Sequence, residues 1–230
     1  VGPITKTVED AALMFSVISG NRPVDLQYRS IVGGRLALLK GTALDDLHQK
    51  TAIAFEQSVN ALSKFGFEIK EVDINEVESA LALSSVLYPS EAYAEWKEEI
   101  EASPELMYDE ILQRFRAGKD VLAADYLKAK GDLETFKKKY YDKISPFDGV
   151  ILPTCPILPP NLERLKSDKG YYVEQNLMAL RNTRIGNLMG VCALTIPTNH
   201  SSCGLSIMSL PNREEKLLRI GRAAENAISM

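Results

Sequence analysis

The stretch that decides the fold runs through Phe147-Asp148-Gly149-Val150-Ile151-Leu152-Pro153-Thr154-Cys155-Pro156. Its centre, Val150–Leu152, is a short apolar run bounded by glycine and proline, which is typical of a buried β-strand. In α/β sheets, ligands collect beyond the carboxyl ends of the strands. The loop Pro153–Pro156 is therefore expected to border a binding site, where Cys155 is either a pocket wall or a small buried hydrophobe.

Outward from this strand, the chain alternates between strand and helix patterns. Further strands are expected at Arg35–Leu39, Phe67–Val72, Ala193–Pro197 and Leu205–Leu210. Helices are expected at Thr7–Gly20, from Asp45-Asp46 to Gly66, over most of Val77–Ile144 with breaks at Pro89 and Pro104, at Val173–Leu188 and at Arg213–Ile228. A proline-rich loop at Pro159-Pro160 and then a polar stretch to about Gly170 are expected. This pattern predicts an α/β fold, a mixed β-sheet flanked by helices, in a single domain over residues 1–230.

Composition and charge exclude several classes of partner. The 230 residues are 45% hydrophobic and 25% charged, with a net charge of −4. A mildly acidic chain has no general attraction for nucleic acid or anionic membranes, and no apolar run approaches the roughly 20 residues that span a bilayer. The three cysteines are widely spaced and odd in number, which indicates reduced thiols in the cytoplasm rather than a disulfide framework.

Most catalytic patterns are absent from the sequence. The two histidines, His48 and His200, have no metal-ligand spacing, so neither a metal nor another cofactor is expected. His48 is expected on the polar side of a helix, exposed to solvent. The sequence has neither a glycine-rich phosphate loop nor a Gly-x-Ser-x-Gly turn.

The segment Asn199-His200-Ser201-Ser202-Cys203-Gly204 places a potential base beside hydroxyls and a thiol. Adjacent residues seldom point toward one another, and catalytic triads are usually assembled from distant parts of a chain. A polar hairpin loop, Thr198–Gly204, between two strands accounts for the same composition.

Four segments together resemble the amidase-signature family. They are Gly2–Ala12, with Gly-Pro and Val-x-Asp-Ala; Ala124–Ala129, with an Asp-Tyr pair; Phe147–Pro156, with Asp, a strand and Pro-Thr-x-Pro; and Arg181–Pro197, with Arg-x-Thr and Asn-x-x-Gly. Their order and spacing, from residue 2 to near residue 200, are similar to the C-terminal region of that family. The resemblance implies the amidase-signature fold, C-terminal part only.

This resemblance implies amide hydrolysis by a Ser–cis-Ser–Lys triad. A serine hydroxyl needs an adjacent base, a lysine needs burial or charged neighbours to act as that base, and backbone N–H groups of a glycine-rich loop stabilise the oxyanion. We find no such loop: Ser84-Ser85 and Ser201-Ser202 lack the neighbouring glycines. In the family these elements precede the position of Gly2. We therefore expect no catalytic residue in this chain, which is predicted to be inactive alone and to need an N-terminal catalytic half.

By the same resemblance, the chain is expected to supply walls of a pocket for a small-molecule amide. The contributing segments are Pro153–Pro156, Ser85–Tyr93 and Arg181–Asn187, and the predicted substrate-binding residues are Tyr88, Thr154, Cys155, Arg181 and Asn187. Tyr88 can stack on a substrate and Arg181 can pair with a carboxylate. Alternatively, Tyr88 packs between helices and Arg181 forms a structural or exposed ion pair.

Two departures leave the subfamily open between amidase and amidotransferase. Leu180-Arg181 stands where the glutamine-handling subunit of tRNA amidotransferases has an acidic residue, and Cys203–Ser206 replaces a Gly-Leu-Pro-x-Gly run. Three interpretations follow: part of an amide hydrolase, a non-catalytic truncated homologue that binds a ligand or another protein chain, or an unrelated α/β domain. A homo-oligomer is compatible with each of them.

Overall fold

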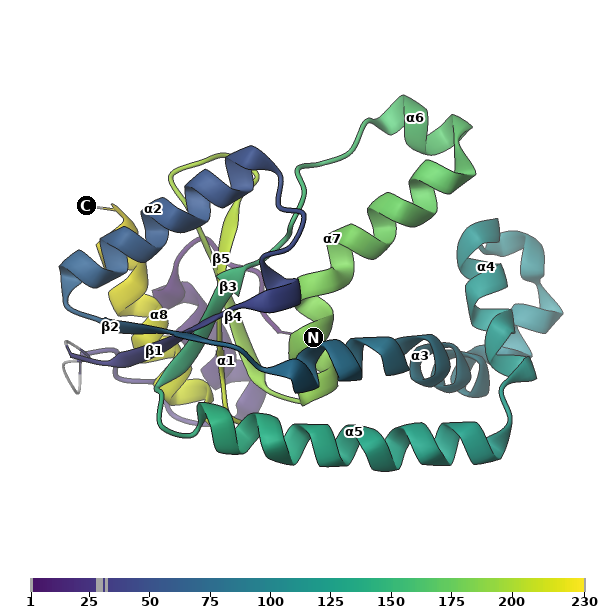
Figure 1. Cartoon of the computed structure of the whole chain (residues 1–230), viewed down its shortest axis with the longest axis horizontal. Helices are drawn as coiled ribbons and strands as arrows, with labels where there is room; N and C mark the ends of the chain where they lie inside the picture. Colours follow the sequence, from purple (N-terminus) through teal and green to yellow (C-terminus); the bar gives the residue numbers. More distant parts are fainter. Residues whose placement is uncertain (1, 28–30, 32, 230) are drawn as a thin grey trace.

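The computed structural model describes residues 2–27, 31 and 33–229. Its centre is a five-stranded sheet in the order β2-β1-β3-β5-β4 (Figure 1). The strands are β1 (Arg35–Leu39), β2 (Glu68–Val72), β3 (Gly149–Pro153), β4 (Cys192–Pro197) and β5 (Gly204–Ser209). β1 runs parallel to β2 and β3, whereas β5 is antiparallel to β3 and β4, so the sheet is mixed, as predicted.

The apolar run in β3 is explained by its central position. Ile151 is paired with Leu38 on one side and with Ile207 on the other. Successive side chains point to opposite faces of a sheet, so Ile151 packs into one hydrophobic cluster while Val150 and Leu152 pack into a second. Both faces are covered, and a strand in this position has no polar side to present to water.

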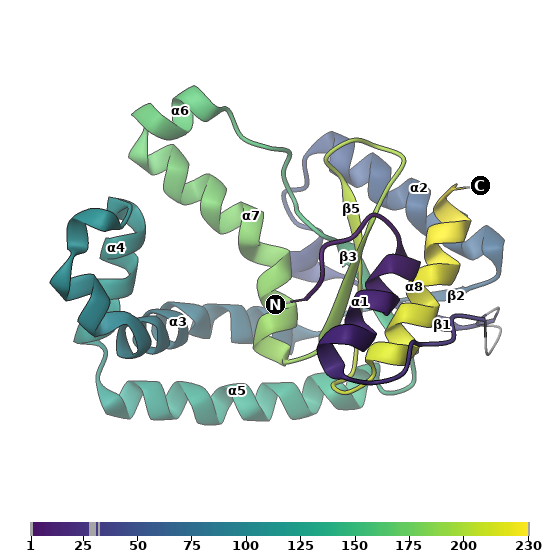
Figure 2. The same cartoon turned by 180° about the vertical axis from the view of Figure 1, so that it is seen from behind.

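Helices cover both faces of the sheet, and those on one face extend beyond it. One face holds α1 (Val8–Ser19), α2 (Gln49–Phe65) and α8 (Glu214–Ser229). The other holds α3 (Asn75–Ala102), α5 (Ala123–Ile144) and α7 (Lys169–Met189). The latter three extend past the sheet toward α4 (Asp109–Arg116) and α6 (Leu162–Ser167), as both views show (Figures 1 and 2). Single 3-10 turns lie at η1 (Gly41–Ala43), η2 (Pro104–Leu106) and η3 (Ala117–Asp120).

Local signals placed several boundaries correctly. The Thr7 hydroxyl accepts a hydrogen bond from the backbone N–H of Asp10, and Gly20 ends α1 in the left-handed conformation at φ 70°. The polar segment after β4 is a hairpin loop, as predicted, closed by a hydrogen bond from the Thr198 N–H to the Cys203 carbonyl.

The predicted start of the second helix was wrong. Asp46 has φ 50°, which is not helical, and α2 begins only at Gln49. His48 is exposed to solvent, as expected, but it precedes the helix and caps it: its Nδ1 accepts a hydrogen bond from the Lys50 N–H. The aspartates suggested a helix N-terminus, but the preceding turn is already occupied by η1, which is buried at Ala43.

Two further expectations for the helical segments were wrong: the break at Pro89 and the start of the next helix at Val173, since α7 begins at Lys169. Pro89 does not break α3, which continues through it, since proline removes only one helical hydrogen bond and tertiary packing compensates. The region from Pro159 to Gly170 also contains α6 and the first residues of α7. Asn161 and Asp168 cap these helices through their side chains. Because Asn and Asp are also common in loops, the same residues suggest a loop when only the sequence is read.

Candidate functional site

The carboxyl end of β3 carries a cluster of hydroxyl groups. The Thr154 Oγ1 lies 2.8 Å from the Ser206 Oγ and 3.5 Å from the Thr195 Oγ1, and the last two lie 3.2 Å apart. Thr154 is also held by its backbone N–H, which donates to the Gly204 carbonyl. Three adjacent strands thus bring their hydroxyls together, although only Thr154 was predicted from the sequence.

A residue of α7 also contacts this end of β3. Asn182 is buried, and its Nδ2 donates to the carbonyls of Ala43 at 2.9 Å and Pro153 at 2.8 Å. It therefore ties α7 to both η1 and the end of β3. The sequence analysis included Asn182 in a motif but assigned it no role. Its role depends on hydrogen bonds to two carbonyls that lie 139 and 29 residues away in the chain.

Arg181 lies beside this edge, close to Cys155. Its Nη2 donates to the Asp45 carbonyl at 2.6 Å and its Nε to the Asn182 Oδ1 at 3.2 Å. Burial lowers the pKa of Arg181, whereas the charges of Asp45, Asp46 and Cys155 oppose the fall. The half-buried guanidinium thus binds neutral acceptors, and Cys155 is a half-buried free thiol.

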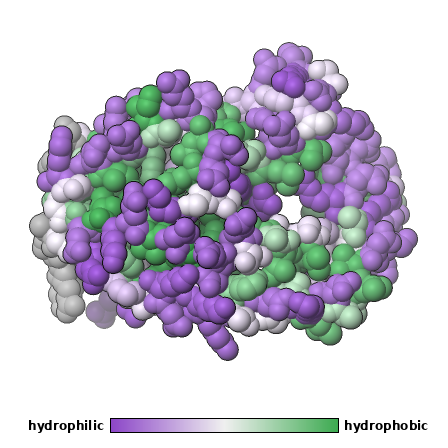
Figure 3. Space-filling view, in the orientation of Figure 1, coloured by the Kyte–Doolittle hydropathy of each residue, from purple (hydrophilic) through white to green (hydrophobic). Residues whose placement is uncertain are grey.

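A cavity of about 510 Å³ lies between α3, α4 and α7, and we call it the α3–α7 cavity. Figure 3 shows the molecule hollowed at this place, with hydrophobic surface along its border. Its lining residues are Ser84, Ser85, Tyr88, Pro89, Arg114, Ala117, Leu177, Leu180, Thr183, Arg184 and Asn187.

Close backbone packing shapes one wall of this cavity. A Cβ atom at Gly118 would overlap the carbonyl of Pro89, so only glycine lets η3 approach α3 so closely. Pro89 has no N–H to donate along the helix, so α3 lacks a regular hydrogen bond at this point. The sequence shows both residues, but not that they meet.

Tyr88 and Asn187 both line the α3–α7 cavity. The Tyr88 hydroxyl is buried and has no hydrogen-bond partner among the described residues. Burial raises the pKa of Tyr88; Arg184 opposes this rise and Glu91 adds to it. The five predicted site residues thus form two groups, Tyr88 with Asn187 in the cavity, and Thr154, Cys155 and Arg181 near the strand ends.

Sequence reasoning singled out neither arginine of the cavity, although Arg184 lies within the expected segment Arg181–Asn187. Arg184 lies one turn after Arg181 on α7, a spacing that indicates a shared helix side. Arg114 comes from α4, with no local signal to connect it to either. Both are charged groups in a largely apolar cavity.

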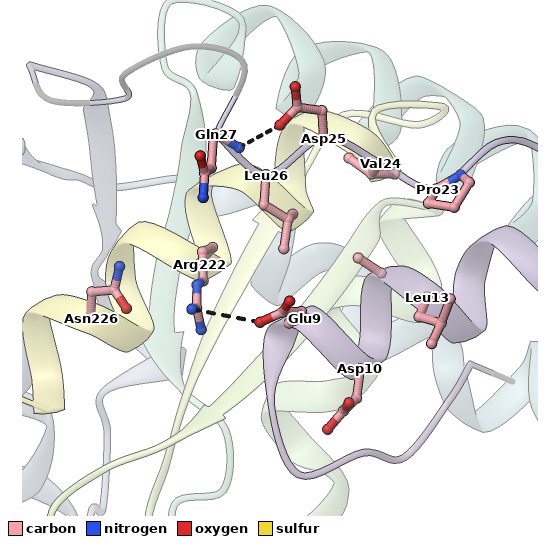
Figure 4. Close-up of a pocket in the computed structure, with 11 residues that line it drawn as sticks. Glu9, Asp10, Leu13, Pro23, Val24, Asp25, Leu26, Gln27, Arg222 and Asn226 are labelled. Carbon is pink, nitrogen blue, oxygen red and sulfur yellow. Dashed lines mark hydrogen bonds and ion pairs between the residues drawn. The ribbon is translucent and has the colours of Figure 1, made fainter.

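A second cavity, of about 610 Å³, is a weaker candidate (Figure 4). It lies between α1, residues 23–27 and α8, and its charged groups already have partners. Arg222 lies 3.8 Å from a Glu9 oxygen and 2.8 Å from a Glu225 oxygen, and Asp25 accepts a hydrogen bond from the Gln27 N–H. Each charged side chain described in this cavity thus has a hydrogen-bond or ion-pair partner.

A serine of the hairpin loop contacts a lysine of α2, but without the surroundings of a catalytic pair. The Lys50 Nζ donates to the Ser201 Oγ at 2.9 Å, and the His200 Nε2 lies 2.8 Å from the Gln57 Oε1. Both contacts are solvent-exposed. A lysine base requires desolvation, which an exposed loop does not provide.

Metal-ligand groupings and membrane-spanning helices are absent from the described part of the chain. Across residues 2–27, 31 and 33–229, no three His, Cys, Asp or Glu side chains are grouped as metal ligands. Among the helices so described, none combines the length and apolar character needed to cross a bilayer.

Comparison with known sequences gives a consistent set of relatives. A family model described as Amidase matches residues 1–218. The chain is 28% identical over 236 residues to a 2-amino-5-chloromuconic acid deaminase from Comamonas testosteroni, covering 99% of this chain and 51% of that protein. It is also 28% identical over 266 residues to a glutamyl-tRNA(Gln) amidotransferase subunit from Sulfurisphaera tokodaii, covering 100% of this chain and 56% of that protein.

Solved structures show the same fold. A crystal structure of an amidase superposes with a TM-score of 0.81 at 19% identity, over 99% of this chain and 52% of that one. A 6-aminohexanoate cyclic dimer hydrolase, complexed with substrate, gives a TM-score of 0.78 at 20% identity, over 98% of this chain and 54% of that one. The chain thus spans about half the length of the proteins it matches.

Proposed function

The chain belongs to the amidase family, and from this we propose that it serves an enzyme hydrolysing the C–N bond of a carboxylic amide. We assign it the C-terminal part of that enzyme, where it forms walls of the substrate pocket. The family-model match over residues 1–218 carries this proposal. The relatives named above, which include a deaminase, a cyclic dimer hydrolase and part of an amidotransferase, are consistent with it.

We propose that the substrate contacts are divided between the two groups of residues described above. Tyr88 and Asn187 contact the substrate within the α3–α7 cavity, while Thr154, Cys155 and Arg181 border the path from the strand ends. Asn182 positions Arg181 and the end of β3 through its hydrogen bonds. The activated serine and its lysine base come from the N-terminal half of the enzyme, and no metal or cofactor takes part.

The surface beside β4 is a suitable place for that half to bind. β4 pairs only with β5 among the described strands, so its outer edge offers free backbone hydrogen-bonding groups. Beside it, residues 2–8 and 193–197 line a groove of about 410 Å³, and Ile4 is fully exposed. The outer face of α1 adds Leu13, Met14, Val17 and Ile18, all exposed. Such an apolar patch next to an open edge favours a protein partner.

We also place the protein in the cytoplasm. Cys155, Cys192 and Cys203 are all free, which fits a reducing compartment.

Labelling with a fluorophosphonate probe tests the assignment. The chain alone should show neither labelling nor amide hydrolysis. When it is co-expressed with the polypeptide encoded immediately upstream, hydrolysis should appear and the labelled serine should lie in that added polypeptide, within a Gly/Ser-rich loop.

Two outcomes would contradict this assignment. A labelled serine and robust turnover in the 230-residue chain alone would place the nucleophile here. A stable complex without hydrolysis, from an upstream region lacking the Gly/Ser-rich loop and lysine, would favour the non-catalytic homologue. The free β4 edge and the apolar α1 face suit that second candidate, a subunit-interaction domain, equally well.

A further inference from the structure

The α3–α7 cavity contains positive charge without a matching carboxylate. Arg114 Nη1 donates to the Asn176 Oδ1 at 2.7 Å. Arg184 donates to the carbonyl of Leu177 at 2.7 Å and lies 3.4 Å and 3.5 Å from the Leu180 carbonyl and the Ser84 hydroxyl. Every one of these acceptors is neutral. In the described part of the chain, neither guanidinium forms an ion pair with a carboxylate.

Two carboxylates on the helices that form the cavity, Glu91 on α3 and Glu110 on α4, have other partners. Glu91 accepts a hydrogen bond from the Tyr126 hydroxyl at 3.0 Å, and Glu110 pairs with Lys169 at 3.0 Å. Two half-buried arginines therefore face one cavity with only neutral partners. Burial lowers the pKa of Arg184; Tyr88 opposes this and the like charge of Arg114 adds to it. An anion in the cavity would offset both the burial and the repulsion.

The Tyr88 hydroxyl supplies a third, independent observation. It is buried without a partner at the same cavity, although buried hydroxyls are normally hydrogen-bonded. An unpartnered donor beside two guanidinium groups matches a ligand with several acceptor oxygens. A carboxylate has two oxygens and about four lone-pair positions, enough to accept from both arginines and the tyrosine.

The other lining residues indicate that the rest of this ligand is apolar. Leu177, Leu180, Pro89 and Ala117 give the cavity an apolar wall. We propose that the α3–α7 cavity recognises a carboxylate on an apolar acyl chain, so that the substrate is an amide that also carries a carboxylate, held by Arg114 and Arg184 with the Tyr88 hydroxyl. The substrate class rests on the function proposed above, whereas recognition of the carboxylate does not.

Titration calorimetry with three small probes tests this proposal on the 230-residue chain. Hexanoate should bind with millimolar or better affinity, while hexanamide, of the same size but neutral, should bind at least about tenfold more weakly, since charge-assisted hydrogen bonds to arginine contribute most of the energy. Sulfate, an anion without an apolar body, should also bind more weakly than hexanoate.

Matched variants locate the site. Arg184→Gln and Arg114→Gln should each weaken hexanoate binding about tenfold, Arg184→Lys less than Arg184→Gln, and Tyr88→Phe a few-fold. Arg164→Gln is the control, because Arg164 pairs with Asp168 on α6, outside the cavity. Its hexanoate affinity should equal that of the unmodified chain, and unchanged thermal melts confirm folding of each variant.

Several results would overturn the proposal. These are undetectable hexanoate binding at tens of millimolar, equal affinity for hexanoate and hexanamide, equal affinity for sulfate, or folded arginine variants that retain full affinity. None of these measurements requires hydrolysis. Carboxylate binding without amidase activity would refute the proposed function alone, and activity toward uncharged amides without hexanoate binding would refute this proposal alone.

Discussion

At the scale of single residues, Asn182 shows how one side chain organises a site edge. It is 1% exposed and donates two hydrogen bonds to carbonyls of η1 and β3. Asn182→Ala should lower the free energy of unfolding by about 2–3 kcal/mol, because two carbonyls lose their donor in a buried place. Urea denaturation measures this effect.

Asn187→Ala is the matched control for Asn182, since Asn187 is exposed on the same helix. Its free energy of unfolding should change by less than about 0.5 kcal/mol. If both variants unfold alike, Asn182 does not have the anchoring role described here.

Tyr140 and Tyr141 are neighbours with opposite hydrogen-bonding status. Tyr140 is fully buried, its hydroxyl has no partner among the described residues, and burial, helped by Tyr141, raises its pKa. Tyr141 donates to the Met189 carbonyl at 2.5 Å. Tyr140→Phe should therefore raise the free energy of unfolding by about 1 kcal/mol, and Tyr141→Phe should lower it by about the same amount.

Guanidinium chloride unfolding of the two Phe variants measures both effects. The opposite signs make each variant a control for the other, because both lose a single oxygen atom from the same turn of α5. A loss of stability in Tyr140→Phe would show that its hydroxyl has a favourable contact.

At the scale of elements, Asp148 connects β1, β3 and α8. One carboxylate oxygen accepts from the Arg35 N–H at 2.7 Å, and the other pairs with Lys216 at 2.7 Å. Burial alone would raise the pKa of Asp148, but the hydrogen bonds from Lys216 and the Arg35 backbone, with their positive charges, lower it overall.

The pH dependence of stability follows from that lowered pKa. The ionised carboxyl stabilises the fold fully above its unfolded pKa, about 3.9, and this contribution is lost as the pH falls through the lower folded value. Asp148→Asn should therefore be less stable than the unmodified chain at pH 7, and the difference should shrink below about pH 4. Urea unfolding between pH 3 and 7 measures it.

The control for this titration is Asp132→Asn, which removes an exposed pair with Lys128 on α5. Exposed pairs contribute at most about 1 kcal/mol, so this variant should follow the unmodified chain at every pH. A constant difference for Asp148→Asn across the whole range would contradict the titration.

At the scale of the whole molecule, α1 carries exposed apolar side chains, and β4 is an edge strand of the described sheet. Exposed patches of this kind promote association. The chain alone should bind a hydrophobic dye and self-associate, and the double variant Leu13→Glu, Val17→Lys should reduce both. Its new side chains are spaced to form an i,i+4 pair.

Dye fluorescence and light scattering measure this prediction. Leu162→Glu is the control, because Leu162 is an isolated exposed leucine on α6. Both variants should keep the free energy of unfolding within about 0.5 kcal/mol. Equal dye binding by the double variant and the unmodified chain would show that the α1 face is not the surface that binds dye and promotes self-association.

The sequence by itself determined the elements whose signal is local. Short apolar or alternating segments predicted the five strands to within a residue or two, and Thr7 and Gly20 marked the ends of α1. Strand burial and helix capping leave signals in neighbouring residues of the chain. It also carried the family resemblance, which the match over residues 1–218 confirmed. The prediction of a single domain over 1–230 remains a prediction.

Only the tertiary structure decided where α2 starts, that Pro89 stays inside α3, and which polar groups meet. Arg114 and Arg184 lie 70 positions apart in the chain, yet they face one cavity with Tyr88. Their closeness follows from the packing of α3 and α7 on the sheet and of α4 against α3. A polar residue is assigned to solvent, structure or ligand by what surrounds it in space, and that is set by long-range burial rather than by local propensity.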